Sequence, residues 1–146
     1  MRADILSRGF VLGVVAVALA GCGGGDDDSG SSCTPPDVSG VVYINDGDAQ
    51  AHGKGQLPAG VKDGDGLNVG LDMGGVSGDI LPDNFFTETC GKTFTYTARG
   101  IGPGTYHVTY TVYDNNSEST PTLFEGTSTN TFTIVSNENV EFNPTF

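Results

Sequence analysis

The ten residues TYHVTYTVYD, Thr105 to Asp114, alternate between apolar and polar side chains along most of their length. In an extended chain, successive side chains point to opposite faces of the sheet. One face of this segment then carries Tyr106, Val108, Tyr110 and Val112. An antiparallel sheet with one face on a core and the other in solvent shows this period of two. We therefore expect a half-buried antiparallel strand here.

Six other segments have the composition or alternation of strands, and no segment has a convincing amphipathic helical pattern. They are residues 41–45, 67–73, 93–99, 121–125, 127–135 and 140–142. Residues 136–139, SNEN, form a predicted turn, so we expect the last two strands to pair as a hairpin. Seven short strands predict an all-β protein, an antiparallel seven-stranded β-sandwich over residues 37–146.

Three stretches resemble the carboxypeptidase-regulatory-like domain, whose broad pattern also occurs in collagen-adhesin B-type repeats. They are VSGVVYIND (38–46), FTYTARGIGPGTYHVTYTV (94–112) and FTIVSNENVEF (132–142). The resemblance implies a transthyretin-like, Ig-like sandwich and a structural, adhesive or accessory module that is generally not catalytic. Pro103-Gly104 would form the turn between two strands. The Gly/Asp-rich segment 46–66 does not align with this family.

The N-terminus has the features of a secretory signal peptide. A head with two arginines precedes Gly9–Ala20, a run of apolar and small residues. As a helix this run would be about 18 Å long, which is too short to span a bilayer core of about 30 Å. Leu19-Ala20-Gly21-Cys22 follows and resembles the bacterial lipobox. The resemblance implies removal of residues 1–21 and lipidation of Cys22. The alternative is an ordinary cleaved signal with a chance cysteine.

Residues 22–36 are predicted to be a flexible tether rich in Gly, Ser and Asp. Within the lipoprotein resemblance, Gly23 at the second mature position, where an Asp would direct retention, indicates the outer membrane. The periplasmic and surface sides both stay open. The formal net charge of -12 argues against nucleic acid as a partner, so the expected contacts are the membrane, through the lipid, and an envelope protein or glycan.

Lipidation of Cys22 would leave Cys33 and Cys90 as a pair in an oxidising compartment, where a disulfide is expected. It would close a loop of about 57 residues and contribute about 4 kcal/mol by chain entropy. The alternatives are two free thiols or a metal site. The metal site has the weaker support because no CxxC motif or nearby histidine accompanies the cysteines.

Calcium is the one cofactor that the residues suggest. Asp63 and Asp65 alternate with glycines, and Asn45, Asp46 and Asp48 form a second cluster of oxygen donors. Neither cluster completes an EF-hand loop, because the third acidic position and the final Glu are missing. The alternative is that these residues serve turn geometry.

The remaining candidates for a functional site are few. His107 is expected on the solvent face of its strand, and His52 lies in the glycine-rich segment with no evident partner. The sequence offers no serine in a nucleophile elbow and no phosphate-binding glycine loop. A threonine face of the sheet could meet a glycan or protein, with Tyr113 as a contact residue. This face would consist of Thr93, Thr95, Thr97, Thr105, Thr109 and Thr111.

These observations predict a lipid-anchored envelope protein that acts as a non-catalytic structural, adhesive or partner-binding module. The alternative is a calcium- or ligand-binding accessory lipoprotein. An enzyme is the third class, and we do not expect one.

Overall fold

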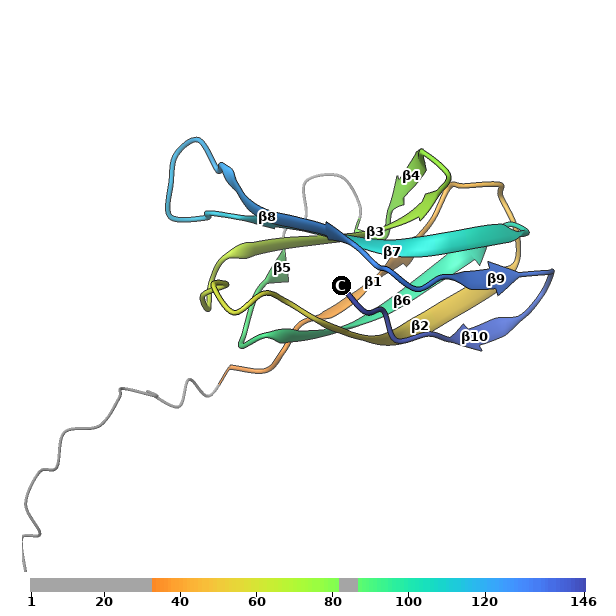
Figure 1. Ribbon diagram of the computed structural model, residues 1–146, viewed down its shortest axis with the longest axis horizontal. Coiled ribbons are helices and arrows are strands. Elements are labelled where there is room, and N and C mark those ends of the chain that lie inside the picture. Colours follow the sequence, from red (N-terminus) through yellow and green to blue (C-terminus); the bar gives the residue numbers. More distant parts are fainter. Residues whose placement is uncertain (1–32, 82–86) are drawn as a thin grey trace, which may run out of the picture. The chain divides into compact units, whose positions relative to one another are not determined.

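The computed structural model describes residues 33–81 and 87–146, and this part of the chain is built from β-strands. The predicted signal peptide, Cys22 and most of the predicted tether lie outside the described residues. Ten strands form two sheets that face each other as two layers (Figure 1). Within the described residues no helix is long and apolar enough to cross a membrane.

The first sheet has the strand order β1-β6-β2-β10. Its strands are β1 (Asp37–Val41), β6 (Thr93–Ile101), β2 (Ala49–Gln56) and β10 (Asn139–Glu141). The central pair β2–β6 is antiparallel, whereas β1 runs parallel to β6 and β10 runs parallel to β2. Both edges of this sheet are therefore parallel additions to an antiparallel centre.

The second sheet contains six strands, of which four follow the order β4-β3-β7-β8. They are β4 (Val76–Asp79), β3 (Gly66–Met73), β7 (Gly104–Tyr113) and β8 (Thr122–Thr127). Two short strands extend the edges: β5 (Thr87–Glu88) pairs with β3, and β9 (Phe132–Ile134) pairs with β7. All of these pairings are antiparallel.

The core lies between the two sheets and uses the predicted alternation. Along β7 the apolar face is buried, with Tyr106 and Val112 fully inaccessible, while the threonines point outward. Strand β6 contributes Phe94, Tyr96 and Ala98 in the same way. The Tyr106 hydroxyl donates a 2.7 Å hydrogen bond to the carbonyl of Gly102, which lies in the connection between β6 and β7. This bond satisfies a buried hydroxyl and fixes the crossing between the sheets.

The architecture differs from the predicted antiparallel seven-stranded sandwich in strand number and direction. Ten strands are present in the described residues, and two pairings are parallel. The predicted hairpin of the last two strands is wrong, because β9 pairs with β7 in one sheet and β10 pairs with β2 in the other. The SNEN turn therefore crosses between the sheets, as the Gly102-Pro103 connection does. Local alternation identifies a strand but not the sheet it joins.

Strand β2 was missed because its sequence, AQAHGKGQ, lacks large apolar residues. Its glycines stand opposite aromatic residues of β6: Gly53 pairs with Tyr96 and Gly55 with Phe94. A Cβ atom at Gly55 would lie 2.2 Å from the Phe94 ring, and one at Gly53 would lie 1.8 Å from the carbonyl oxygen of Phe142. The glycines leave room for the neighbouring aromatic rings and backbone. The segment 46–66, which does not align with the family, therefore contains β2, a central strand of the first sheet.

The last residues of the chain join the two sheets at one open side of the sandwich. The Oδ1 atom of Asn143 accepts a 2.8 Å hydrogen bond from the backbone of Lys54 in β2. Asn130, which follows β8, donates to the Asn143 carbonyl and accepts from the Thr145 backbone at 2.8 Å. The chain end, labelled C, lies between the two layers in Figure 1. This closing segment, residues 142–146, therefore bridges β2 to the β8–β9 connection.

Candidate functional site

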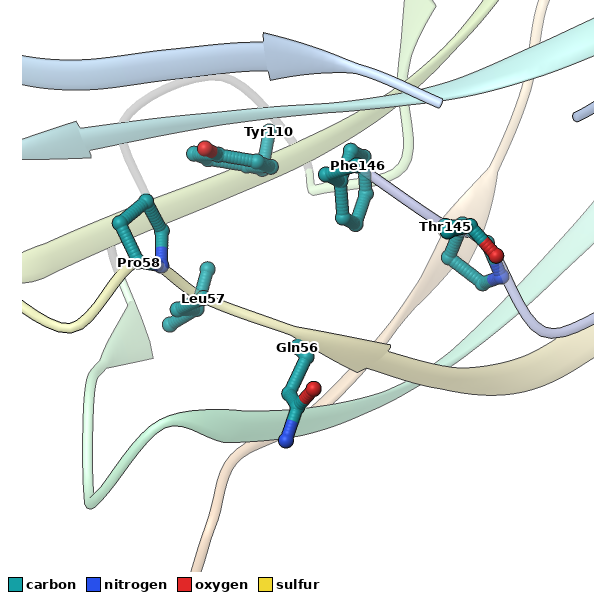
Figure 2. A pocket seen from close by; sticks show the side chains of 7 residues that line it. Gln56, Leu57, Pro58, Tyr110, Thr145 and Phe146 are labelled. Carbon is teal, nitrogen blue, oxygen red and sulfur yellow. The ribbon is translucent and has the colours of Figure 1, made fainter. Parts of the chain in front are cut away.

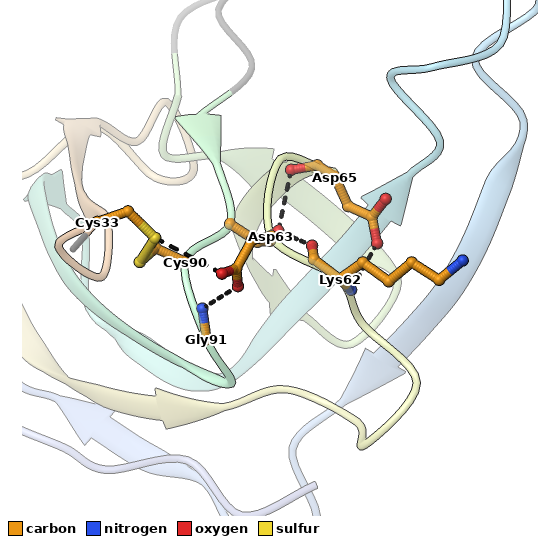
Figure 3. The surroundings of a disulfide bond; sticks show 7 residues. Cys33, Lys62, Asp63, Asp65, Cys90 and Gly91 are labelled. Atoms are coloured by element: carbon orange, nitrogen blue, oxygen red, sulfur yellow. Dashed lines mark hydrogen bonds between the residues drawn. A yellow bond between two sulfur atoms is a disulfide. The ribbon is translucent and has the colours of Figure 1, made fainter. Parts of the chain in front are cut away.

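A disulfide between Cys33 and Cys90 confirms the expected pairing, with a Cα–Cα distance of 5.8 Å (Figure 3). Cys33 is exposed at the start of the described chain, four residues before β1, and Cys90 is buried between β5 and β6. The bond links the segment that precedes β1 to the connection between β5 and β6. Its partner residues are 57 positions apart in the sequence.

The loop that carries Asp63 and Asp65 packs against the disulfide. Asp63 Oδ1 accepts a 2.6 Å hydrogen bond from the backbone of Gly91, and Asp65 Oδ2 accepts one of 2.9 Å from the backbone of Lys62. Thr89 donates its hydroxyl to the Lys62 carbonyl at 2.6 Å. The Asp63 carboxylate thus binds the Gly91 backbone, and the Asp65 carboxylate binds the Lys62 backbone. This is the structural role in turns that we gave as the alternative to calcium binding. Calcium binding stays a prediction.

The second oxygen of Asp63 faces the disulfide. Asp63 Oδ2 lies 3.8 Å from Cys33 Sγ, the contact drawn as a dashed line in Figure 3. A disulfide sulfur carries no proton, so this contact is not a hydrogen bond in the oxidised protein. Cys33, Cys90 and Asp63 each place one ligating atom within 4.8 Å of the others. The fold has therefore gathered two sulfurs and a carboxylate that lie far apart in the sequence.

The outward face of the second sheet holds a shallow polar groove of about 610 Å³. We call it the outer groove; its lining residues are Asp72, Gly75, Ser77, Asp79, Thr109, Tyr110, Thr111, Glu125, Gly126 and Thr127. Strand register brings them together: Ser77 stands opposite Asp72, and Glu125 stands opposite Thr111. Gly70 lies between Asp79 and Thr109 in the register and offers no side chain to fill the face.

The outer groove includes part of the predicted threonine face, namely Thr109 and Thr111. The sequence reading missed its carboxylates, Asp72, Asp79 and Glu125, because they come from three different strands. Only the pairing register shows that they share a face with the threonines. The available signal was polar residues at every second position, Ser77 and Asp79 in one segment and Glu125 and Thr127 in another.

A second hollow of about 440 Å³ lies at the side of the sandwich, beside the closing segment (Figure 2). Leu57, Pro58, Tyr110 and Phe146 give it a largely apolar lining. The rings of Tyr110 and Phe146 meet edge to face, with centroids 4.7 Å apart. Burial raises the pKa of the Tyr110 hydroxyl.

The remaining sequence candidates do not converge on one site. His107 is half-buried on β7, and its Nδ1 atom lies 2.6 Å from the Ser128 carbonyl, to which it donates. His52 Nδ1 lies 2.9 Å from Asn139 Oδ1 on the parallel neighbour β10, a partner that the sequence did not reveal. Both histidines therefore have structural hydrogen bonds. Tyr113 is half-buried at the end of β7 and does not line the outer groove.

The chain matches no family model, no curated protein and no solved structure in the comparisons with known proteins. Its function is therefore argued from the residues and their geometry.

Proposed function

We propose that the chain is a lipid-anchored protein of the bacterial outer membrane whose β-sandwich is a non-catalytic, partner-binding module. The anchor is supported by the sequence alone: Leu19-Ala20-Gly21-Cys22 follows the apolar run, and Gly23 follows the cysteine. Lipid on Cys22 would tie the chain to the membrane, and residues 23–32 would separate the sandwich from its surface.

The observation that carries the binding role is the outer groove. Carboxylates and hydroxyls from four strands line it, and the core does not need them. An envelope protein can offer backbone and side-chain donors to this surface, and a glycan can offer its hydroxyls. Many weak polar contacts across an open face are typical of structural and adhesive modules rather than of enclosed catalytic pockets.

Metabolic labelling tests the anchor. Cells that express the full chain are fed a palmitate analogue, and we expect label on the wild type and on a Cys90→Ser variant. Cys22→Ser should abolish the label and release the protein from the membrane fraction. Label that persists on Cys22→Ser would contradict the anchor without affecting the binding role.

A matched pair of variants tests the binding role. Asp79→Asn with Glu125→Gln removes two charges from the outer groove, and Glu141→Gln removes one from the exposed end of β10. Surface plasmon resonance compares how strongly the wild type and the two variants bind peptidoglycan, lipopolysaccharide and cross-linked envelope proteins. We expect the groove variant to weaken binding at least 5-fold and the control to leave it unchanged. Equal binding by all three proteins would overturn the groove as the contact surface.

A further inference from the structure

We propose that Cys33, Cys90 and Asp63 form a redox-dependent site for a thiophilic divalent cation, with Zn²⁺ as the best match. In the oxidised protein the sulfurs are joined to each other. After reduction the same residues present two thiols and a carboxylate from three separate segments. A bound cation would then hold these segments together in place of the disulfide.

The geometry of Asp63 supports this assignment. Its Oδ1 atom is held by the Gly91 backbone at 2.6 Å, which leaves Oδ2 directed at Cys33 Sγ from 3.8 Å. Tetrahedral zinc, with bonds of about 2.3 Å to sulfur and 2.0–2.2 Å to oxygen, separates such ligands by about 3.6 Å. The hydrogen bond from Gly91 orients the carboxylate as outer-shell partners orient metal ligands. The sulfurs have to separate to about 3.8 Å in such a tetrahedron, and all three ligating atoms already lie within 4.8 Å of one another.

The surroundings allow that movement. Cys33 is exposed and precedes β1, so its side chain can rotate without disturbing the core, while Cys90 keeps its place next to Gly91. Figure 3 shows the Lys62 ammonium directed away from the sulfurs, so it does not occupy the space between them and Asp63. Two thiolates and one carboxylate carry three negative charges, of which a divalent cation neutralises two. Water would complete the four-coordinate shell.

The chemistry needs a reductant, and a dithiol supplies it. Thiolate attack breaks the Cys33–Cys90 bond; the dithiol gives up two electrons and two protons and becomes a disulfide, and both cysteines become thiols. The cation then binds the two sulfurs and Asp63 Oδ2, and both thiol protons are released to solvent. A disulfide oxidant would reverse the step: it takes two electrons from the two thiolates and two protons from solvent and becomes a dithiol, and the restored Cys33–Cys90 bond would expel the cation.

The sequence could not show this site. The cysteines are 57 residues apart, and neither belongs to a CxxC motif. The third ligand comes from the Asp63 loop, which the calcium hypothesis had assigned to a hard cation. Sulfur ligands favour a softer cation such as Zn²⁺ over calcium.

The test uses the full chain with Cys22→Ser, so that Cys33 and Cys90 are the only thiols. The protein is reduced with a phosphine, desalted without oxygen, and titrated with Co²⁺ and then with Zn²⁺. We expect one Co²⁺ per chain with a thiolate charge-transfer band, displacement of that band by Zn²⁺, and a higher Tm of the reduced protein with Zn²⁺. The oxidised protein should show none of these.

Asp63→Asn keeps an oxygen for Gly91 but removes the anionic ligand, and should weaken Zn²⁺ binding at least 10-fold. Asp48→Asn, in an exposed loop, should bind as the parent does. Absence of the charge-transfer band, or equal affinity of both variants, would overturn the site. If reduction alone unfolds the sandwich, recovery of its circular dichroism by one equivalent of Zn²⁺ supports the proposal, and failure to recover contradicts it.

Discussion

Cys33 and Cys90 are the residues whose covalent bond constrains the largest part of the domain. We expect the double variant Cys33→Ser with Cys90→Ser to lower the free energy of unfolding by about 4 kcal/mol, because the unfolded chain regains the freedom of a 57-residue loop. Urea titration of both proteins measures the difference. The slope of the transition should rise in the variant, since its unfolded state is less compact. A loss below about 1 kcal/mol would show that the loop-entropy argument fails here.

Tyr96 makes stability depend on alkaline pH. Burial raises the pKa of its hydroxyl above the ordinary value of about 10, and the hydroxyl donates a 2.8 Å hydrogen bond to the Phe142 carbonyl. Above pH 10 the unfolded chain loses this proton and the folded chain retains it, so stability falls as pH rises. We expect the Tm of the wild type to drop between pH 9.5 and about 11.5. Tyr96→Phe should be less stable at pH 8 by about 1 kcal/mol but show a shallower alkaline decline.

Strand β2 depends on its glycines as strictly as β7 depends on its apolar face. A methyl group at Gly53 would collide with the Phe142 carbonyl, which is backbone and cannot rotate away. Gly53→Ala should therefore destabilise the sandwich by about 2 kcal/mol and speed hydrogen exchange in β2 and β10. Lys54→Ala, on an exposed position of the same strand, is the control and should change stability by less than about 0.5 kcal/mol. Equal stabilities for the two variants would contradict the steric argument.

At the level of elements, the sequence predicted the strands whose large side chains carry the signal. Strands β3, β6 and β7 lie within a few residues of their predicted bounds because aromatic and β-branched residues alternate along them. Strand β2 escaped prediction because its stability comes from aromatic groups of β6 packed over glycines. The disulfide followed from cysteine arithmetic, whereas the outer groove depends on register between β4, β3, β7 and β8, which local sequence does not encode.

At the scale of the whole molecule, the two sheets are held together by contacts between segments that lie far apart in the sequence. The strand order places β1 and β10 at opposite edges of the first sheet. The disulfide links the segment before β1 to the β5–β6 connection. At the other end of the chain, Asn143 in the closing segment bonds to Lys54 and to Asn130. Connections that cross between sheets, such as 102–103 and 135–138, make these contacts long-range in sequence. Such a topology is expected to fold slowly.

The closing segment gives a prediction for the molecule as a whole. Asn130→Ala removes the donor to the Asn143 carbonyl and the acceptor of the Thr145 backbone. The β8–β9 connection is then linked to the chain end through Thr129, whose backbone and hydroxyl both donate to the Thr145 carbonyl. We expect a loss of about 1–2 kcal/mol, faster hydrogen exchange over residues 142–146, and greater solvent exposure of Phe146 beside Tyr110. Asn116→Ala, in an exposed turn where the Asn116 backbone donates to Asp114, is the control. If Asn130→Ala speeds hydrogen exchange in the closing segment but not around the Cys33–Cys90 disulfide, the two sets of contacts stabilise the sandwich independently. Loss of protection throughout the sandwich would instead mean that the closing segment is part of the cooperative core.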